Sequence, residues 1–199
     1  MNISAVKPPG STKARLLAIT ERLMSARGYE GVAIKDIAAK AGLRPAAIFH
    51  HFPTKADLVA AALAASVENL RGFLGAIEAE TEDPRARIAR LVSLFGETKS
   101  AQGEFCFAGV LAASSNELPE GVLAGVDRFR SVFAGWVATQ FRATRPQDPE
   151  RDMEAGPARV GEAVLALAEG ALLVARMSGD RDSYGRTVSL LLPPLLAAP

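Results

Sequence analysis

Apolar side chains recur along this chain at intervals of three and four residues, the period of an α-helix, and no segment alternates as a β-strand would. The first such stripe, formed by Leu16, Ile19 and Leu23, predicts a helix over residues 12–27. We expect it to stop at Gly28, because glycine readily takes the left-handed backbone that ends many helices.

The same period predicts further helices, bounded by glycine, proline or polar residues. Two segments lack it: residues 1–11 are expected to be a disordered tail and residues 145–157 a loop. The pair Pro193–Pro194 is expected to kink or end the last helix. The chain is therefore predicted to be all-α with about nine helices. Those after the first are expected over residues 32–42, from Pro45 onward, and over residues 55–79, 84–99, 105–115, 119–144, 158–178 and 182–197.

Composition points to a globular protein rather than a membrane-spanning or secreted one. The 199 residues suffice for a sizeable core, and about half of them are hydrophobic. The N-terminal residues lack the apolar run of a secretory signal, and the longest apolar-leaning run, residues 163–175, is interrupted by Glu169 and too short for a bilayer. Cys106 is the only cysteine, so a reducing compartment, the cytoplasm, is expected, with no membrane partner.

Charge is distributed unevenly along the chain. Residues 1–60 hold nine Lys and Arg against four Asp and Glu, whereas residues 61–199 hold fourteen against eighteen. The net charge of +1 therefore hides a basic first third attached to an acidic body. This asymmetry favours a module that faces a polyanion; chance clustering of surface charge is the alternative.

Two short helices joined by the sequence AGL form the pattern of a helix-turn-helix. Gly42 suits the tight turn because glycine tolerates a positive φ, and Pro45 suits the first helical position because its missing N–H would be unpaired there. In such a motif the first helix packs across the second, whose outer face can enter a DNA major groove. On the turn alone, an ordinary helical hairpin is the alternative.

The stretch over residues 12–63 closely resembles the DNA-binding domain of the TetR family of bacterial transcriptional repressors. The resemblance rests on RGYEG, IKDIAAKAG, TKADL, and IFHHF in place of the family's leucine-tyrosine-x-histidine-phenylalanine. It implies a homodimer that binds a pseudopalindromic operator in double-stranded DNA and leaves it when a small-molecule effector binds. Residues 12–54 would then be the helix-turn-helix DNA-binding domain, and residues 55–199 the effector-binding and dimerisation domain.

The resemblance also implies roles for individual residues. The helix from Pro45 would enter the major groove, and the start of the next helix would contact phosphate. Lys55 matches the family's phosphate-binding lysine, and we expect its ammonium, beside a helix N-terminus, to require a nearby anion. Phe49 and His50 stand where members often place aromatic residues that contact DNA. The residues expected at DNA are Lys35, Arg44, Pro45, Ala46, Ala47, Phe49, His50 and Lys55.

The sequence departs from the family pattern in three places. Val32 and Ala33 stand near positions where members usually carry a Thr or Ser that caps a helix and touches phosphate, so that contact is lost. Phe49 replaces a tyrosine, and Ala46 and Ala47 can meet only thymine methyl groups. We therefore expect the shape and deformability of the operator to carry much of the specificity. The hydrogen-bonding readers that remain are Lys35, Arg44 and His50.

The two histidines of the chain, His50 and His51, are adjacent, which suggests a metal site or a catalytic pair. Neighbouring residues on a helix point about 100° apart, so the two cannot do the same job. No nearby cysteine or acidic pair completes a zinc site, so no metal and no cofactor is predicted. His50 is expected to contact DNA, and His51 to pack and hydrogen-bond within the small domain.

Aromatic residues after position 90 could form the walls of an effector cavity between helices. Ordinary core packing is the alternative for each, and Trp136 is the strongest candidate for the cavity. Cys106 lies in GEFCFAG, which resembles a helix start where some family members sense electrophiles; buried packing is the alternative. The predicted lining is Phe95, Cys106, Phe107, Phe129, Phe133 and Trp136.

The last two predicted helices are so apolar that a monomer would not bury both fully. We expect them to form a four-helix bundle with a second copy, with small residues permitting close approach. The predicted dimer interface is Gly161, Val164, Ala168, Ala171, Val188, Leu191, Leu192 and Leu195.

Two other functions stay open on the sequence. The apolar Val32 and Ala33 and the change to Phe49 favour a helical interaction protein with a degenerate DNA-binding domain. An all-helical enzyme would need a base and a nucleophile, but both histidines lie in the recognition stretch and Cys106 has no partner visible in the sequence. No catalytic residue is therefore predicted.

Overall fold

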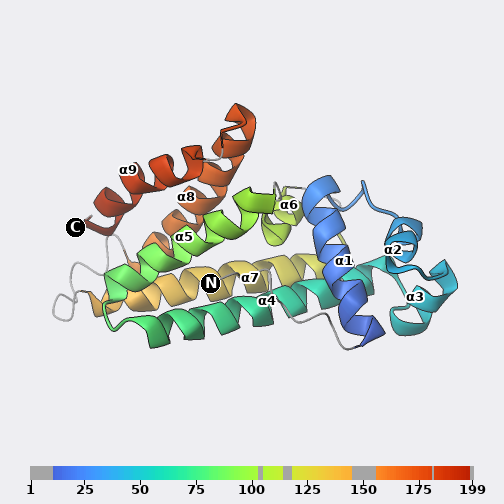
Figure 1. The fold of residues 1–199 in the computed structure, drawn as a ribbon. Helices are drawn as coiled ribbons and strands as arrows, with labels where there is room; N and C mark the ends of the chain where they lie inside the picture. The colour runs from blue at the N-terminus through green and yellow to red at the C-terminus, as the bar shows by residue number, and fades with distance from the viewer. Residues whose placement is uncertain (1–10, 103–104, 114–117, 145–155, 181, 198–199) are drawn as a thin grey trace. The chain divides into compact units, whose positions relative to one another are not determined.

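The computed structural model describes residues 11–102, 105–113, 118–144, 156–180 and 182–197, and all regular structure in these ranges is α-helical (Figure 1). The predicted all-α fold is confirmed. The predicted tail, apart from Ser11, and most of the predicted loop lie outside the described residues. The helices are α1 (Thr12–Arg27), α2 (Ile34–Ala41), α3 (Pro45–His51), α4 (Lys55–Glu80), α5 (Pro84–Gln102), α6 (Phe107–Ala112), α7 (Glu120–Ala143), α8 (Pro157–Ser178) and α9 (Ser183–Ala197).

The proline pair in α9 does not end the helix. α9 continues through Pro193 and Pro194 to Ala197. Leu192 and Leu196, on either side of the pair, are both buried. Packing of these two leucines holds the last turn in place despite the missing backbone donors.

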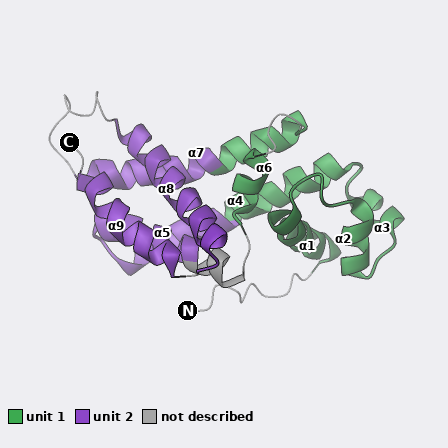
Figure 2. Cartoon of the chain, turned by 90° about the horizontal axis from the view of Figure 1, so that it is seen from above, with its two compact units in different colours: residues 1–68, 104–129 green, residues 69–103, 130–199 purple. Residues whose placement is uncertain are grey.

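The chain divides into two compact units (Figure 2). Residues 1–68 and 104–129 form unit 1, and residues 69–103 and 130–199 form unit 2. Helices α4 and α7 each contribute residues to both units. The compact units therefore do not divide at residue 54, and the assignment of separate functions to the two predicted domains stays a prediction.

Unit 1 contains the three N-terminal helices. α1 packs against α2 and α6, and α2 packs against α3. Leu16, Ile37 and Ile48, one from each of the first three helices, are fully buried. The Arg15 guanidinium donates a hydrogen bond to the carbonyl of Ala41, at the C-terminal end of α2. A cation there satisfies a carbonyl that the helix leaves unpaired, and so fixes α2 on α1.

Unit 2 contains the C-terminal helices. α8 packs against α5 and α9, and α5 also packs against α9. The buried Tyr184 of α9 donates its hydroxyl to the carbonyl of Val92 on α5, at 2.7 Å. A side chain at Gly96 would collide with the ring of Tyr184, so this glycine makes room for it. Burial raises the pKa of Tyr184 well above its usual 10.0, because the charged phenolate would lose hydration.

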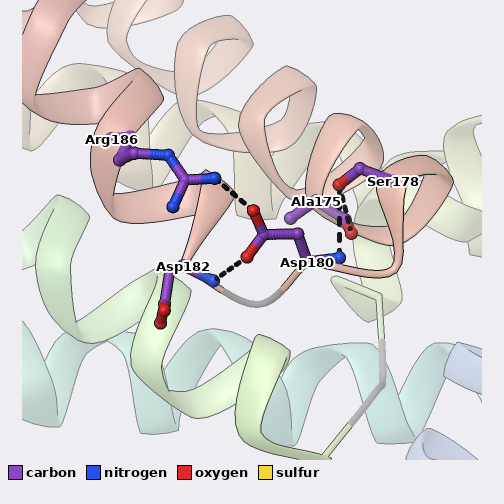
Figure 3. Close-up of polar contacts among 5 residues, drawn as sticks. All are labelled: Ala175, Ser178, Asp180, Asp182 and Arg186. Atoms are coloured by element: carbon purple, nitrogen blue, oxygen red, sulfur yellow. Dashed lines mark hydrogen bonds and ion pairs between the residues drawn. The ribbon is translucent and has the colours of Figure 1, made fainter.

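The turn between α8 and α9 is stabilised by side chains (Figure 3). The Ser178 hydroxyl donates to the carbonyl of Ala175 and accepts from the backbone N–H of Asp180. The Asp180 carboxylate accepts from the backbone N–H of Asp182 and pairs with Arg186. The hydrogen bond from Arg186 is the main reason that the pKa of Asp180 lies below its usual value. These contacts link the end of α8 to the first turn of α9.

Among the described helices, α4 is long and apolar enough, by length and composition, to cross a membrane. Its buried residues Leu58, Val59, Ala62 and Leu63 recur at the spacing of one helical face, and exposed residues follow on the other. That amphipathic pattern is typical of a helix that packs on a protein core.

Candidate functional site

The turn between α2 and α3 has the geometry that the sequence predicts. Gly42 is left-handed, with φ 67° and ψ 31°. The N–H of Leu43 reaches back to the carbonyl of Ala38 at 2.9 Å, which closes the end of α2. Arg44 is then extended, and Pro45 is the first helical residue of α3. The predicted backbone roles of Gly42 in the turn and of Pro45 at the first helical position are confirmed.

Helix α3 has one buried anchor and a broad exposed face. Ile48 is fully buried, whereas Pro45 and Ala46 are exposed, as is His50 one turn later. Phe49 is 47% exposed, unusual for a side chain of this size. The face that α3 presents to solvent is therefore mainly apolar, with a single imidazole among the residues predicted to contact DNA.

The prediction for His51 is wrong. His51 is exposed, and its ring lies edge-on to that of His50, with centroids 5.6 Å apart. The packing role belongs to Phe52, which is only 4% exposed. The ammonium of Lys13 lies 5.7 Å from the centroid of the Phe52 ring, in range of a cation–π contact that ties α1 to the end of α3.

Lys55 does not need an anion to explain its position. Its ammonium donates to the carbonyl of Tyr29 at 2.7 Å and lies 4.0 Å from the centroid of the Tyr29 ring. That carbonyl and aromatic face satisfy the cation, so the expectation that an anion must lie nearby is wrong. A phosphate contact by Lys55 stays a prediction.

The start of α4 is fixed by a reciprocal cap that the sequence reasoning missed. The Thr54 hydroxyl accepts from the N–H of Asp57 at 3.1 Å, and the Asp57 carboxylate accepts from the N–H of Thr54 at 3.0 Å. The signal was present as T-x-x-D directly before an apolar run. The cap holds the first turn of α4, which carries Lys55.

The start of α2 lacks the Thr or Ser hydroxyl expected near Val32 and Ala33, and the side chain of Asp36 takes over part of its role. Val32 is fully buried, and Ala33 occupies the N-cap position without a side chain that could accept a hydrogen bond. The Asp36 carboxylate accepts from the N–H of Ala33 at 2.8 Å. One unpaired donor is thereby satisfied from within the helix. Lys35 is exposed next to this cap, and Arg44 is exposed at the start of α3.

The residues predicted to line an effector cavity fall into two groups. Cys106, Phe107 and Phe129 are buried and belong to unit 1. Phe95 and Phe133 belong to unit 2, where their ring centroids are 5.8 Å apart in an edge contact. Trp136, also in unit 2, is half-buried. Burial of Cys106 places its thiol away from solvent, and its role as a sensor stays a prediction.

Trp136 lines an open groove of about 400 Å³ between α4 and α7. Its indole Nε1 donates to the Glu78 carboxylate at 2.7 Å. Sequence reasoning selected Trp136 but not Glu78, because a helical pattern does not reveal a partner 58 residues away. The residues that line this groove are Arg71, Leu74, Gly75, Glu78, Ser131, Val132, Gly135 and Trp136.

The residues predicted at a dimer interface divide between core and surface. Gly161, Val164, Ala168 and Ala171 of α8 are buried in the chain's own core instead, so they cannot face a second copy. The prediction is corrected for these four. On α9, Leu192 is buried, Val188 and Leu195 are half-buried, and Leu191 is exposed. The strongly exposed large apolar residues of the two helices are Leu173, Val174, Met177, Leu190 and Leu191.

Comparisons with known proteins match the N-terminal region most specifically. Residues 16–62 match the sequence profile described as "Bacterial regulatory proteins, tetR family". The chain is 35% identical over 80 residues to the HTH-type transcriptional regulator CymR of Pseudomonas putida, a match that covers 40% of this chain and 34% of CymR. It is 32% identical over 81 residues to the HTH-type transcriptional repressor KstR2 of Rhodococcus jostii, covering 41% of this chain and 40% of KstR2. The chain thus spans well under half the length of these curated relatives.

Longer matches cover most of the chain at lower identity. The HTH-type transcriptional regulator EthR of Mycolicibacterium smegmatis is 24% identical over 167 residues, covering 82% of this chain and 72% of EthR. A solved TetR transcriptional regulator from Legionella pneumophila superposes with a TM-score of 0.82 at 24% identity, covering 91% of this chain and 95% of its own. One from Agrobacterium tumefaciens gives a TM-score of 0.79 at 24% identity, covering 95% and 97%. These structures show that the fold is shared.

Proposed function

Because this chain belongs to the TetR family of bacterial regulatory proteins, we propose that it is a sequence-specific, DNA-binding transcriptional regulator of the bacterial cytoplasm. It acts as a repressor that leaves its operator when a small-molecule effector binds. The observation that carries the proposal is the exposed face of α3, which follows a tight glycine turn and is anchored from behind by Ile48. Such a helix can enter a major groove without disturbing its own core.

The composition of that face determines how it reads DNA. Arg44 and His50 supply the hydrogen bonds to base edges from α3 and its N-cap, and Lys35 adds one from α2. Phe49, Pro45 and Ala46 offer only apolar contact, so the operator is recognised largely through its shape.

Fluorescence anisotropy with labelled DNA from upstream of the chain's own gene tests the proposal. We expect binding that weakens steeply with salt, because phosphate contacts release counterions. Arg44→Ala should lower the affinity for the preferred sequence by about 5- to 150-fold, the range for a lost base contact. Arg85→Ala, which removes an exposed arginine from α5, is the matched control and should change little. DNA binding that is absent or independent of salt would instead favour the helical interaction protein.

Readout by shape has its own test. Each contacted base pair of the operator is changed in turn and the affinity measured by band shift. We expect modest losses at most positions and larger ones at flexible steps that the protein bends. Steep losses at most contacted base pairs would contradict readout by shape but not DNA binding.

The second copy docks on the exposed apolar face of α8 and α9. Met177 is 79% exposed and Leu190 is 72% exposed, on two helices that pack against each other. Large apolar side chains left this exposed on packed helices are typical of a protein interface. Sedimentation velocity should show a dimer for the native chain and a monomer for the double variant Met177→Glu, Leu190→Glu. Phe73→Glu, which charges an exposed aromatic on α4, is the control and should remain dimeric.

A further inference from the structure

We propose that the groove between α4 and α7 binds an organic monocation with an apolar body, and that its positive charge lies against the Glu78 carboxylate, beside the Trp136 indole. All the residues that line the groove belong to unit 2. Its volume of about 400 Å³ falls in the range of small-molecule sites.

Two glycines lower the floor of the groove. Gly75 lies inside α4 and Gly135 inside α7, and a Cβ added to either would meet no atom within 4 Å. Helix packing therefore does not require glycine at either position. Each costs its helix about 1 kcal/mol relative to alanine. What the two glycines provide is open space over the groove floor, where a ligand can lie close to both backbones.

The polar end of the groove has the chemistry of a cation site. One Glu78 oxygen accepts from Trp136 Nε1 at 2.7 Å, and no cation of the described residues pairs with this carboxylate. A carboxylate beside an indole attracts a positive charge in two ways, by ionic attraction and by the negative face of the aromatic ring. An anionic ligand would be repelled at this end.

This polar end is held in place before any ligand arrives. The Arg87 guanidinium donates to the carbonyl of Glu78 at 3.2 Å and to the carbonyl of Thr81 at 2.7 Å. It also donates to the side chain of the buried Gln140, at 3.1 Å, and so ties the end of α4 to α7. With its backbone held by Arg87 and its side chain by Trp136, Glu78 loses little freedom on binding.

The rest of the lining suits an apolar body with one charge. Leu74 and Val132 provide apolar walls. Glu78 supplies the one carboxylate of the described lining, which favours a ligand with a single positive charge.

Binding in the groove does not depend on DNA, but its use as the effector site rests on the proposed function. Trp136 is the single tryptophan of the chain, so its fluorescence reports directly on the groove. The probes are benzyltrimethylammonium, neutral benzyl alcohol and anionic phenylacetate, titrated into the full chain. We expect saturable binding of the cation and at least about tenfold weaker binding of the other two. Equal binding of all three would overturn the proposal.

Two variants test the assigned contacts. Glu78→Gln keeps an acceptor for Trp136 and should weaken binding of the cation at least about tenfold, whereas Glu82→Gln, an exposed carboxylate nearby, should leave it unchanged. Gly135→Leu, whose Cβ would meet no atom within 4 Å, places a side chain in the groove and should abolish binding; Gly121→Leu, on the same helix and with the same open space at its Cβ, should not. Unchanged binding in Glu78→Gln or in Gly135→Leu would overturn the site.

Fluorescence anisotropy with labelled upstream DNA then distinguishes binding of a ligand in the groove from release of DNA by that ligand. Release of DNA by benzyltrimethylammonium supports the groove as the effector site. Saturable fluorescence binding without release supports the site and overturns that role. If the chain binds no DNA, the proposed function fails, and the fluorescence results alone decide whether the groove binds cations.

Discussion

Gly161 of α8 lies against the backbone of Ala134 on α7, and replacing it with alanine tests whether that close approach stabilises unit 2. A Cβ at this position would point at the backbone of Ala134, 2.8 Å from its carbonyl carbon and 3.1 Å from its Cα. Ordinary contacts of this kind are 3.4–4 Å long. The obstacle is backbone, so it cannot turn aside as a side chain could, and the two helices must separate.

The magnitude is the difference between two opposing effects. Alanine favours the helix by about 1 kcal/mol over glycine. Overpacking in a close-packed core costs about 1–3 kcal/mol, and the upper end applies because backbone atoms are in the way. We therefore expect Gly161→Ala to lower the free energy of unfolding by about 2 kcal/mol. Gly72→Ala on α4 meets nothing within 4 Å and should raise it by about 0.5–1 kcal/mol.

Thermal and urea unfolding at one fixed protein concentration, followed by circular dichroism, measure both variants. A difference of about 3 kcal/mol corresponds to melting temperatures that differ by about 6–12 °C in a chain of this size. If Gly161→Ala were as stable as Gly72→Ala, the two helices would not be held at the spacing described, and the close approach of α7 and α8 would be refuted.

Two further predictions concern buried polar groups. Ser25 is 1% exposed, and its hydroxyl has no hydrogen-bond partner among the residues that the structure describes. Ser25→Ala should therefore raise the free energy of unfolding by about 1 kcal/mol in urea titrations; a loss of stability would mean that the hydroxyl is satisfied. Tyr184→Phe should cost about 1 kcal/mol near neutral pH, because the hydroxyl no longer donates to Val92. Folding raises the pKa of Tyr184, so its contribution to the free energy of unfolding is fully present below pH 10 and is lost as the pH rises further. Measured against pH, the free energy of unfolding should therefore fall more steeply above pH 10 for the native chain than for Tyr184→Phe.

The helix-turn-helix could be predicted from sequence because its signals are local. Gly42 and Pro45 act through their own backbone angles, and the apolar period of α1 is visible within sixteen residues. Contacts between distant residues were not predictable in this way. The partner of Lys55 is Tyr29, 26 residues earlier, and no spacing rule links the two. A lysine at a helix start therefore suggested an anion when a carbonyl and a ring were already present.

The histidine pair shows a second limit. His51 and Phe52 are adjacent at the end of α3, where the helix gives way to extended backbone. A shift of one residue at such a boundary decides which side chain turns inward. The resemblance placed His50 at DNA and so left the inward role to His51, whereas the structure buries Phe52, the more hydrophobic of the two.

Helix α8 has apolar residues on two faces, and this is why the predicted dimer interface was partly wrong. It also means that the corrected interface can be tested by substitutions on each face. A helix that is apolar on several sides shows in its sequence that it is buried, but not which side meets the chain's own core and which meets a partner. Small residues occupy the inner face, where Gly161 meets α7, while Met177 stands on the outer face, 79% exposed. Substitutions on the two faces should therefore have different effects, one on unfolding and the other on association. Gly161→Ala alters unfolding through contacts within one chain, whereas charging Met177 acts on association. A charged Met177 that unfolded the chain without changing its oligomeric state would place this residue in the core and contradict the assignment.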